Sequence, residues 1–271
     1  MTAAAERWRQ QLAAWALPAE LLGTVPESPY GWPPALWRRR AETAAARGET
    51  TPTLARVLAL GGAGGSVLDV GAGTGRASLT LARQGHHITA VEPNPDMLLG
   101  LRELTADLPV EVVEGSWPEV AGRVAVHDVA MCAHVVYDVA DVGPFLWGLH
   151  QHGARGVVIE LTAVHPWAHL GRYYRALHNL ERPSGPTAAD LAEVVAEVTG
   201  TVPEVERWTR PPDLWFESIG EVLEFYGRRL VVPRTRWKEL ESLLAPEIVD
   251  EGGRFRLGGE DRALVTIWWS R

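Results

Sequence analysis

The chain has 271 residues, of which 46% are hydrophobic and 22% are charged, with a formal net charge of −8. These proportions are those of a folded protein with a substantial core, and they exclude a disordered chain. The negative charge argues against a broad phosphate-binding face, because neutralising phosphates requires clustered Lys and Arg. With Cys132 as the single cysteine, an intrachain disulfide is also excluded.

No segment of the sequence has the pattern of a membrane or export signal. The opening residues, MTAAAERWR, carry charges where a signal peptide needs an apolar run. No stretch approaches the roughly eighteen uncharged apolar residues of a membrane span. We therefore expect a cytoplasmic protein with neither a membrane nor a nucleic-acid partner.

The first sixty residues have helical character. Apolar residues at helical spacing predict helices over 3–15, 35–47 and 53–60, the last preceded by Thr51 as N-cap and Pro52 in the first turn. The connection around residues 27–34 is rich in turn residues and aromatics. The glycine-rich run 61–65 then breaks the pattern, so we expect an N-terminal helical cap over residues 1–60.

A glycine-rich motif follows at residues 66–79, SVLDVGAGTGRASL. A short apolar strand runs into Gly71, Gly73 and Gly75 and then into a helix. Alternating glycines leave the backbone bare where a ligand must lie against it, which predicts a nucleoside-like cofactor. The fingerprint of dinucleotide-binding proteins has Gly or Ala where this chain has Arg76, so a nicotinamide cofactor is disfavoured.

From Asp69 onward, strands alternate with helices, which predicts a mostly parallel sheet with helices on both faces. Further strands are expected over 88–91, 110–113, 128–132 and 156–161. Glu92 ends the second of these strands about twenty residues after the glycines, near the distance at which an acidic side chain reaches ribose hydroxyls. His134 and Tyr137 follow the fourth strand, where ligands of open α/β sheets bind.

The run from Asp69 to Gly75, of the form D-x-G-x-G-x-G, resembles the first motif of the class I S-adenosylmethionine-dependent methyltransferases. The resemblance implies a Rossmann-like, doubly wound α/β fold with a seven-stranded, mostly parallel sheet whose strand seven is antiparallel. The remaining elements would be a helix over 188–198 and strands over 202–208 and 263–269. The methyltransferase domain would span residues 61–271, with insertions at about 165–186 and a helical one at about 211–244.

The same resemblance implies S-adenosyl-L-methionine as cofactor and gives roles to individual residues. Asp69 would order the amino group of the methionine part, Glu92 would hold the ribose, and Met97 would cover the adenine. Many members of the family carry Asp where this chain has Ser116, so Ser116 and Trp117 would flank the adenine here. The complete set of expected cofactor-binding residues is Asp69, Gly71, Ala72, Gly73, Gly75, Glu92, Pro93, Met97, Ser116, Trp117, Cys132 and Ala133.

For catalysis, the sequence offers His134 as a general base, because its ordinary pKa lies near neutrality, and Tyr137 as a group that orients the acceptor. Methyl transfer from a sulfonium is an in-line displacement, so both residues are alternatively walls of the pocket. Acceptor-binding candidates, including aromatics of an N-terminal lid, are Tyr30, Trp32, Trp37, His134, Tyr137, His165 and Tyr173. The alternative for the lid and the insertions is simple packing onto the sheet. No metal site is expected, because Pro166 disrupts the helical face of His165 and His169.

The predicted function is methyl transfer to an oxygen or nitrogen of a small-molecule acceptor. A first alternative is an RNA or protein acceptor, for which the run Arg38 to Arg40 is the support. A second alternative is an NAD(P)-binding oxidoreductase or a non-catalytic nucleoside-binding protein. The loop after the fourth strand lacks the Asn/Asp-Pro-Pro-Tyr/Phe motif, which disfavours enzymes that methylate exocyclic or amide nitrogens. No pattern in the sequence indicates an oligomeric state.

Overall fold

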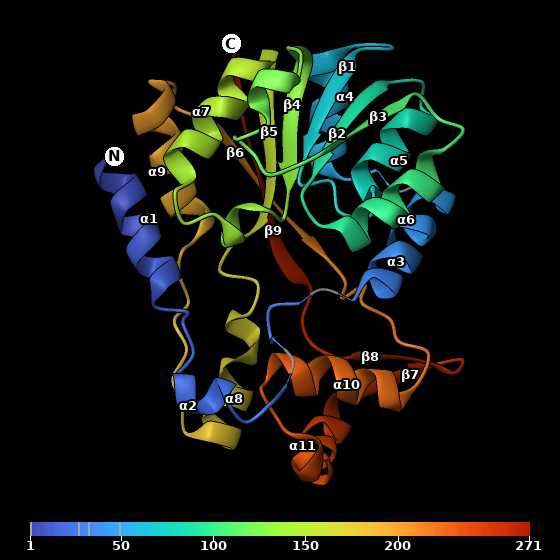
Figure 1. Ribbon diagram of the computed structural model, residues 1–271, viewed down its shortest axis with the longest axis vertical. Coiled ribbons are helices and arrows are strands. Elements are labelled where there is room, and N and C mark those ends of the chain that lie inside the picture. The colour runs from blue at the N-terminus through green and yellow to red at the C-terminus, as the bar shows by residue number, and fades with distance from the viewer. Residues whose placement is uncertain (1, 27, 32, 49) are drawn as a thin grey trace.

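The structure is a computed structural model that describes residues 2–26, 28–31, 33–48 and 50–271. Its centre is a seven-stranded sheet with the strand order β3-β2-β1-β4-β5-β9-β6 (Figure 1). The last strand in the sequence, β9, pairs antiparallel with both β5 and β6, whereas β1 to β5 are parallel. The predicted Rossmann-like sheet with an antiparallel strand seven is therefore confirmed.

The strands of this sheet follow the predicted apolar runs to within a few residues. Their bounds are β1 Ser66–Val70, β2 His87–Glu92, β3 Val110–Glu114, β4 His127–Ala133, β5 Gly153–Thr162, β6 Glu204–Arg210 and β9 Arg262–Ser270. Strands β1, β4 and β5 are buried along most of their length. They read as nearly continuous apolar segments because helices cover both faces of a parallel sheet.

Eleven α-helices lie in the described part of the chain. Their bounds are α1 Ala3–Ala13, α2 Ala19–Leu22, α3 Pro34–Ala46, α4 Pro52–Gly61, α5 Arg76–Arg83, α6 Pro95–Thr105, α7 Val142–His152, α8 Gly171–His178, α9 Ala188–Thr199, α10 Ile219–Arg229 and α11 Trp237–Leu244. Short 3-10 turns cover Ala121–Arg123, Val136–Asp138, Ala168–Leu170, Arg234–Arg236 and Ala245–Glu247. The core on one face of the sheet includes α1, α7 and α9, and the core on the other includes α4, α5 and α6.

Local sequence fixes where the helices next to the sheet begin. Thr51 accepts a hydrogen bond from the backbone N–H of Leu54 and caps α4, with Pro52 in the first turn, as predicted. Asn94 caps α6 by accepting from the N–H groups of Asp96 and Met97. Because Asn94 follows Glu92 so closely, this cap holds the end of β2 at a fixed place beside the glycine motif.

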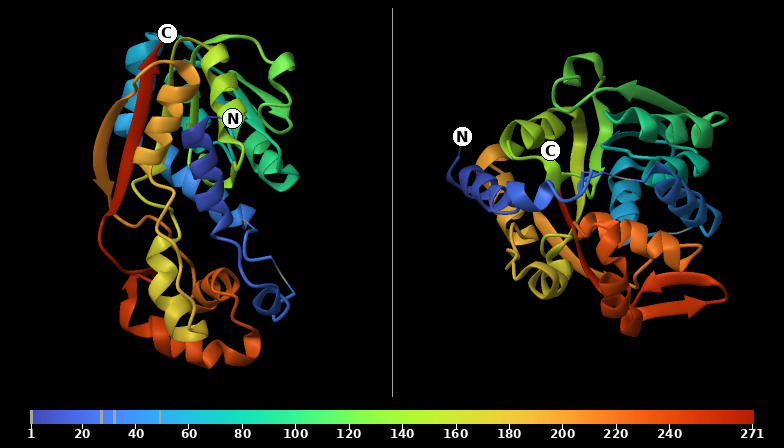
Figure 2. Two further views of the ribbon diagram at one scale, coloured as in Figure 1. Left: turned by 90° about the vertical axis from the view of Figure 1, so that its left-hand side faces the viewer. Right: turned by 60° about the horizontal axis from the view of Figure 1, so that its bottom comes forward.

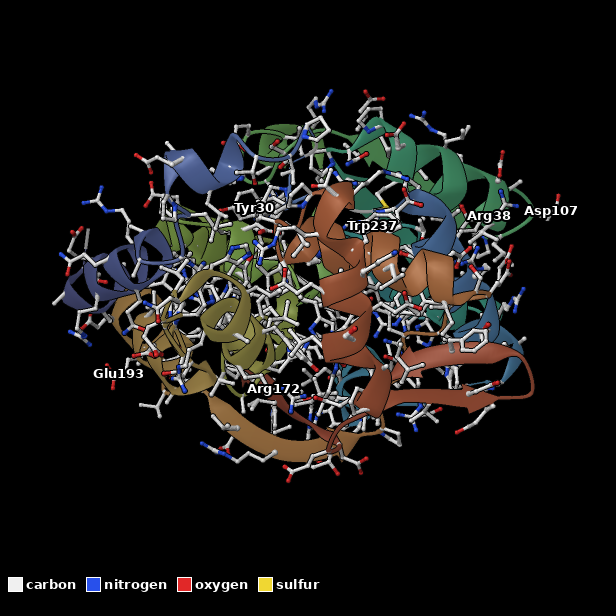
Figure 3. All side chains as sticks on the ribbon, turned by 90° about the horizontal axis from the view of Figure 1, so that it is seen from below. Tyr30, Arg38, Asp107, Arg172, Glu193 and Trp237 are labelled. Carbon is white, nitrogen blue, oxygen red and sulfur yellow. The ribbon has the colours of Figure 1, made fainter. Side chains whose placement is uncertain are left out.

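A third hydrophobic core, besides those on the two faces of the sheet, lies beyond the carboxyl ends of the parallel strands (Figure 1). It joins α2, α8, α10, α11 and the hairpin of β7 Ile248–Glu251 and β8 Arg254–Leu257, which we call the cover layer. Figure 3 shows this layer from below, with Arg172 and Trp237 belonging to it. The sequence predicted the helical part of the insertion at 211–244 but missed the hairpin that extends it to Leu257.

The first sixty residues contribute to more than one layer. Helix α1 packs against α7 and α9, α3 packs against α5 and α6, and α4 packs against the strands. Residues from the segment after α1, including Leu17 and Leu36, enter the core of the cover layer. The N-terminal segment therefore ties the sheet to the cover layer (Figure 2). The domain boundary between residues 60 and 61 stays a prediction.

Candidate functional site

A cavity of about 1150 Å³ lies between the carboxyl ends of the strands and the cover layer. Its volume exceeds the roughly 300 to 1,000 Å³ of a pocket for one drug-sized ligand, so it has room for two molecules side by side. We call the part formed by the loops after β1, β2 and β3 the strand end. The part formed by α3, the cover layer and the adjoining ends of β6 and β9 is the cover end.

Most of the predicted cofactor-binding residues line the strand end together. They are Asp69, Gly71, Ala72, Gly73, Glu92, Pro93, Met97, Ser116, Trp117 and, at the margin of the other end, Ala133. Strands β1, β2 and β3 are neighbours in the sheet, so the loops that follow them meet at one edge. This edge adjoins the β1–β4 border, where the direction of winding reverses and ligands of such folds bind.

The three glycines of the motif have different roles. All have positive φ, at 71° for Gly71, 58° for Gly73 and 89° for Gly75. A Cβ at Gly71 would lie 2.4 Å from Val135 Cγ2, whereas a Cβ at Gly73 would have no atom within 4 Å. Gly73 therefore presents bare backbone to the cavity.

Gly75 does not line the cavity, which corrects the expectation that it contacts a cofactor. Its left-handed conformation begins α5, and a Cβ there would lie 2.6 Å from Leu101 Cδ1. The residue is needed for the close approach of α5 to α6, and the sequence pattern alone could not separate this packing role from a binding role.

Two buried carboxylates stand at the strand end. Asp69 is 2% exposed, and one of its oxygens accepts a hydrogen bond from Ser78 Oγ at 2.6 Å. Burial raises the pKa of Asp69 to about 6, and the charge of Glu92 adds to this. Glu92 is 7% exposed, and burial raises its pKa as well.

The carboxylate of Glu92 holds the glycine motif in place. Its Oε2 accepts from the backbone N–H of Gly73 at 2.8 Å, and its Oε1 accepts from that of Asn94 at 2.9 Å. Each carboxylate oxygen has a further lone pair for a ligand hydroxyl. The strand end thus combines negative charge, bare backbone and unused acceptor capacity.

The apolar part of the strand end is rigid. Met97 is 6% exposed and Trp117 is 8% exposed, and both line the cavity. Trp117 Nε1 donates to the carbonyl oxygen of Phe145 at 3.1 Å, which fixes the plane of the indole. Ser116 lies beside it on the cavity wall, so a flat ring bound here would meet one hydroxyl and two apolar side chains.

Cys132 was predicted to line the cavity and does not. Successive side chains of a strand point to opposite faces of the sheet. Its neighbours Met131 and Ala133 line the cavity, so Cys132 points into the core on the other face, where it is fully buried. Burial also raises the pKa of its thiol, which excludes a thiolate nucleophile.

His134 and Glu160 form a buried pair between the two ends of the cavity. His134 Nε2 lies 3.0 Å from Glu160 Oε1, although off the line of an aligned hydrogen bond. The residues are adjacent because Ala133 pairs with Glu160 in the register of β4 and β5. His134 has a φ of 61°, a left-handed conformation that a non-glycine residue rarely adopts. Its backbone N–H donates to the backbone carbonyl oxygen of Glu160 at 2.9 Å.

The electrostatics of this pair favour a neutral imidazole beside an ionised carboxylate. Burial lowers the pKa of His134, and the nearby carboxylate of Glu160 offsets only part of that shift. For Glu160, burial raises the pKa, but His134, the hydroxyl of Thr53 and Arg210 together lower it to about 2. A neutral imidazole oriented by a carboxylate can accept a proton from a bound acceptor.

Sequence reasoning missed Glu160. A signal was present, because Glu160 is the carboxylate within the otherwise apolar strand 156–161. A buried charge in such a strand requires a partner, and a partner on the neighbouring strand end was a reasonable expectation.

Tyr137 and His165 line the cavity as predicted, but both are committed to protein contacts. The Tyr137 hydroxyl lies 2.6 Å from Thr162 Oγ1, and burial raises its pKa. The ring of His165 stacks on Trp15 at 3.8 Å and meets Tyr137 edge-on at 5.5 Å. Burial lowers the pKa of His165 to about 3, so it is a neutral wall residue.

The predicted aromatic lid is present in part. Tyr30 and Trp37 line the cavity, and Tyr30 stacks on Trp167 at 5.6 Å between ring centroids. Figure 3 shows Tyr30 from below, beside α10. Trp32 lies outside the described residues.

Tyr173, a predicted acceptor-binding residue, does not line the cavity. It is 2% exposed and belongs to the core of the cover layer, where its hydroxyl accepts from Arg172 at 3.0 Å. Helix α8 turns Tyr173, Tyr174 and Leu177 inward as its apolar face, so their spacing signals core packing.

The side chains of Arg38, Arg39 and Arg40 point in different directions from helix α3. Arg38 pairs with Glu42 and Glu103 and Arg39 pairs with Glu221 on the surface. Arg40 turns inward, lines the cavity and donates two hydrogen bonds of 2.9 Å to Asp213. Three further arginines line the cover end, namely Arg210, Arg229 and Arg262, and Arg76 lines the cavity at the start of α5. Sequence reasoning assigned none of them to the site.

The described residues form neither a cluster of metal ligands nor a membrane-spanning helix. Within residues 2–26, 28–31, 33–48 and 50–271, no three His, Cys, Asp or Glu side chains are grouped so that they could hold a metal ion. None of the helices described for this chain has the length and apolarity to span a membrane.

Comparison with known proteins agrees with this geometry. Residues 67–152 match a family model described as a methyltransferase domain. No curated protein sequence matches the chain.

Several solved structures share the fold. A putative methyltransferase from an antibiotic biosynthesis pathway of Anabaena variabilis is 16% identical, with 79% of this chain and 95% of that chain covered and a TM-score of 0.50. YcgJ from Bacillus subtilis is 13% identical, with 81% and 97% covered and a TM-score of 0.50. A magnesium protoporphyrin IX methyltransferase from Synechocystis, solved with bound SAH, is 12% identical, with 86% and 92% covered and a TM-score of 0.48.

Proposed function

We propose that the chain is a class I S-adenosylmethionine-dependent methyltransferase that transfers the methyl group of S-adenosyl-L-methionine to an oxygen or nitrogen of a small-molecule acceptor. The observation that carries this proposal is the His134–Glu160 pair, which stands between a strand end suited to the cofactor and a cover end lined by the insertions. The cofactor supplies the electrophilic methyl group, and the residues of this chain supply alignment, a dry pocket and a proton acceptor.

The strand end fits S-adenosylmethionine in shape and charge. A Cβ at Gly73 would point into open space, so ligand atoms can approach the backbone there. Glu92 has acceptor capacity for ribose hydroxyls, and Asp69 would attract the ammonium of the methionine part. Met97, Ser116 and Trp117 would surround the adenine. Ala72 and Pro93 complete the wall, and Ala133 stands beside His134 at the methyl-transfer position.

The enclosure of the reacting position supports a small acceptor. His134 and Glu160 line a cavity of about 1150 Å³ between the sheet and the cover layer, a volume suited to a cofactor and one small molecule. The surface arginines Arg38 and Arg39 already have carboxylate partners, which removes the support for an RNA acceptor. Tyr30 and Trp37 would line the space for the acceptor, with Tyr137 and His165 as fixed walls.

In the proposed reaction, His134 removes the proton of the acceptor hydroxyl or amine. Glu160 faces Nε2, so the tautomer with the proton on Nε2 is favoured and Nδ1 is the accepting atom. As the acceptor loses its proton, the imidazolium formed is stabilised by the carboxylate 3.0 Å away. S-adenosylmethionine bound at the strand end would supply the methyl group to the deprotonated acceptor and would leave as S-adenosylhomocysteine.

The test begins with a labelled-methyl screen of a metabolite extract to obtain a working acceptor. We expect His134→Gln to lower kcat by a factor of about 10² to 10⁴ and Glu160→Gln by about 10². Affinity for S-adenosylhomocysteine should stay within a factor of about 2 in both variants. The pH profile of the wild type should fall on the acid side as His134 becomes protonated, and that limb should be absent in His134→Gln.

His178→Gln is the matched control, because His178 is also a half-buried histidine but contacts the carbonyl of Leu230 in the cover layer. It should retain the wild-type rate and pH profile. Rates in His134→Gln and Glu160→Gln within threefold of wild type would exclude a base role while leaving methyl transfer intact. Glu92→Ala tests the cofactor end separately: S-adenosylhomocysteine affinity that stays within a factor of about 2 would mean that the ribose assignment is wrong.

We also propose a cytoplasmic location for the protein. Fractionation of cells that express the chain with a C-terminal tag would test it, and recovery in the membrane or medium fraction would contradict it.

A further inference from the structure

Two arginines face each other at the point where the sheet meets the cover layer. Arg210 ends β6, Arg262 begins β9, and the two are direct partners in the antiparallel register. Figure 2 shows these two strands side by side, running toward the cover layer. Both side chains line the cavity. Like charges directly opposite one another on neighbouring strands are destabilising, so this pair needs negative charge nearby.

Part of that negative charge comes from Asp213. Its carboxylate accepts two hydrogen bonds from Arg40 and lies 3.7 Å from Arg210 and 3.6 Å from Arg76. Together these cations lower the pKa of Asp213 far below its ordinary value, against the effect of burial. Arg262 makes no ion pair with the residues that the structure describes. Its guanidinium therefore retains donors for a ligand in the cavity.

The charges of the cavity are separated along its length. The strand end carries Asp69, Glu92 and Glu119, with Arg76 beside it at the start of α5, whereas the cover end carries Arg40, Arg210, Arg229 and Arg262. The wall outside these two ends carries charges of both signs, from Arg9, Asp138, Asp141 and Glu160. The first set matches the cationic sulfonium and ammonium groups of the cofactor. The second set matches an anion on the other molecule in the cavity.

Arg40, Arg210 and Arg262 line the same cavity as His134, so one bound molecule can contact His134 and these arginines. The charges of Arg40 and Arg210 both lower the pKa of His134. An acceptor whose nucleophile faces His134 can thus place a second group against the guanidinium groups. Guanidinium binds carboxylate and phosphate oxygens through paired, parallel hydrogen bonds.

We propose that the methyl acceptor carries an anionic group, a carboxylate or a phosphate, which Arg262 and Arg210 bind at the cover end while its hydroxyl or amine faces His134. This inference rests on the proposed methyl transfer. It makes the enzyme a methyltransferase of anionic metabolites, with Arg262 as the residue that selects for the charge.

The experiment uses the full chain with labelled S-adenosylmethionine and a metabolite extract separated by anion exchange at neutral pH. We expect transfer of label to compounds in the retained, anionic fraction and not to those in the flow-through. Treatment of the retained fraction with alkaline phosphatase distinguishes the two sources: loss of the acceptor identifies a phosphate, and persistence identifies a carboxylate. For the acceptor found, Arg262→Gln should raise KM at least tenfold with a smaller change in kcat.

Two further variants separate binding from folding. Arg262→Lys keeps the charge and should restore part of the lost affinity. Arg234→Gln removes a cover-layer arginine that pairs with Glu224 on the surface and does not line the cavity, so its KM should equal that of the wild type. Affinity for S-adenosylhomocysteine should be the same in all of these proteins.

The outcomes that overturn the inference differ from the failure of the proposed function. Label transferred only to flow-through compounds would establish methyl transfer and refute the anionic acceptor. An unchanged KM in Arg262→Gln would also refute it. A loss of S-adenosylhomocysteine affinity in Arg262→Gln would assign the arginine to the carboxylate of the cofactor instead. Absence of labelled product from every fraction would contradict the proposed function itself.

Discussion

The two ends of the cavity are built in opposite ways. The strand end comes from short segments that directly follow neighbouring strands, and its polar groups are mainly backbone groups and two carboxylates. The cover end comes from α3, the ends of β6 and β9 and the insertions, and side chains of Arg, Trp and Tyr form its walls. Under the proposed function, this fold would separate the part that binds the cofactor from the part that selects an acceptor.

The ends also differ in how they tolerate change. At the strand end, the glycines have positive φ angles, and a Cβ added at Gly71 would lie within van der Waals distance of its neighbours, so few side chains are tolerated there. At the cover end, aromatic stacking and ion pairs have alternatives of similar energy. Substitutions at the strand end should therefore affect folding and cofactor binding, and those at the cover end should affect the acceptor.

The largest expected effect is that of Gly71→Ala. The added Cβ would lie 2.4 Å from Val135 Cγ2 on a backbone with a φ of 71°. We expect a loss of about 3 to 5 kcal/mol in the free energy of unfolding, from overpacking and backbone strain together. Urea unfolding followed by circular dichroism measures it.

Gly73→Ala is the matched control, because its φ is also positive but no atom lies within 4 Å of the added Cβ. It should cost about 1 kcal/mol of stability and yet lower S-adenosylhomocysteine affinity at least tenfold, since the methyl group enters the cavity. Equal stability losses in the two variants would contradict the distinct roles of these glycines.

A smaller effect, dependent on pH, is expected for Asp69→Asn. Burial raises the pKa of Asp69 from 3.8 to about 6, so the protonated form is favoured in the folded state. The stabilisation is fully present below pH 4 and is lost as pH rises through 6. The wild type without cofactor should lose about 3 kcal/mol relative to the variant over this range.

Urea unfolding of both proteins at pH 4, 6 and 8 provides the measurement. The difference between the two free energies of unfolding is the informative quantity, because other groups titrate equally in both. A difference that stays constant from pH 4 to pH 8 would show that Asp69 is not the buried acid that the structure describes.

The smallest effect is expected for Tyr173→Phe, which tests the boundary of the cover end. Its hydroxyl contacts Arg172 within the cover layer and does not reach the cavity. We expect about 1 kcal/mol of destabilisation and an unchanged KM for the acceptor. A raised KM in Tyr173→Phe would place the acceptor deeper in the cover layer.

Tyr30→Ala should instead raise the KM for the acceptor by about 2- to 10-fold, because it removes the ring stacked on Trp167 at the cavity wall.

The same contrast explains which features could be predicted from the sequence. The sheet was predictable because buried parallel strands are apolar runs bounded by Gly, Pro and polar residues. The meeting of the glycine motif and Glu92 at one cavity was predictable because their positions follow from short spacings along one βαβ unit. Gly75 and Cys132 were assigned to the cavity wrongly, since the motif does not say which way a residue faces.

The cover end could not be predicted in the same way. Glu160 lies beside His134 because of a register between strands, and Arg262 lies beside Arg210, a residue more than fifty positions away in the sequence. The β7–β8 hairpin had a local signal, because Gly252 and Gly253 both adopt the positive φ of a tight hairpin turn. Its strands are short and partly charged, so the apolar pattern gave no sign of them.

The register of β6 and β9 has a consequence for how such an enzyme changes over evolution. The backbone leaves the sheet at Arg210 and rejoins it at the directly paired Arg262, so the two ends of the segment 211–261 are adjacent in the sheet. Insertions, deletions or wholesale replacement of this segment would leave every hydrogen bond of the sheet in place. The module that holds most of the cover layer is therefore exchangeable, and a new acceptor can be acquired without rebuilding the machinery that binds the methyl donor.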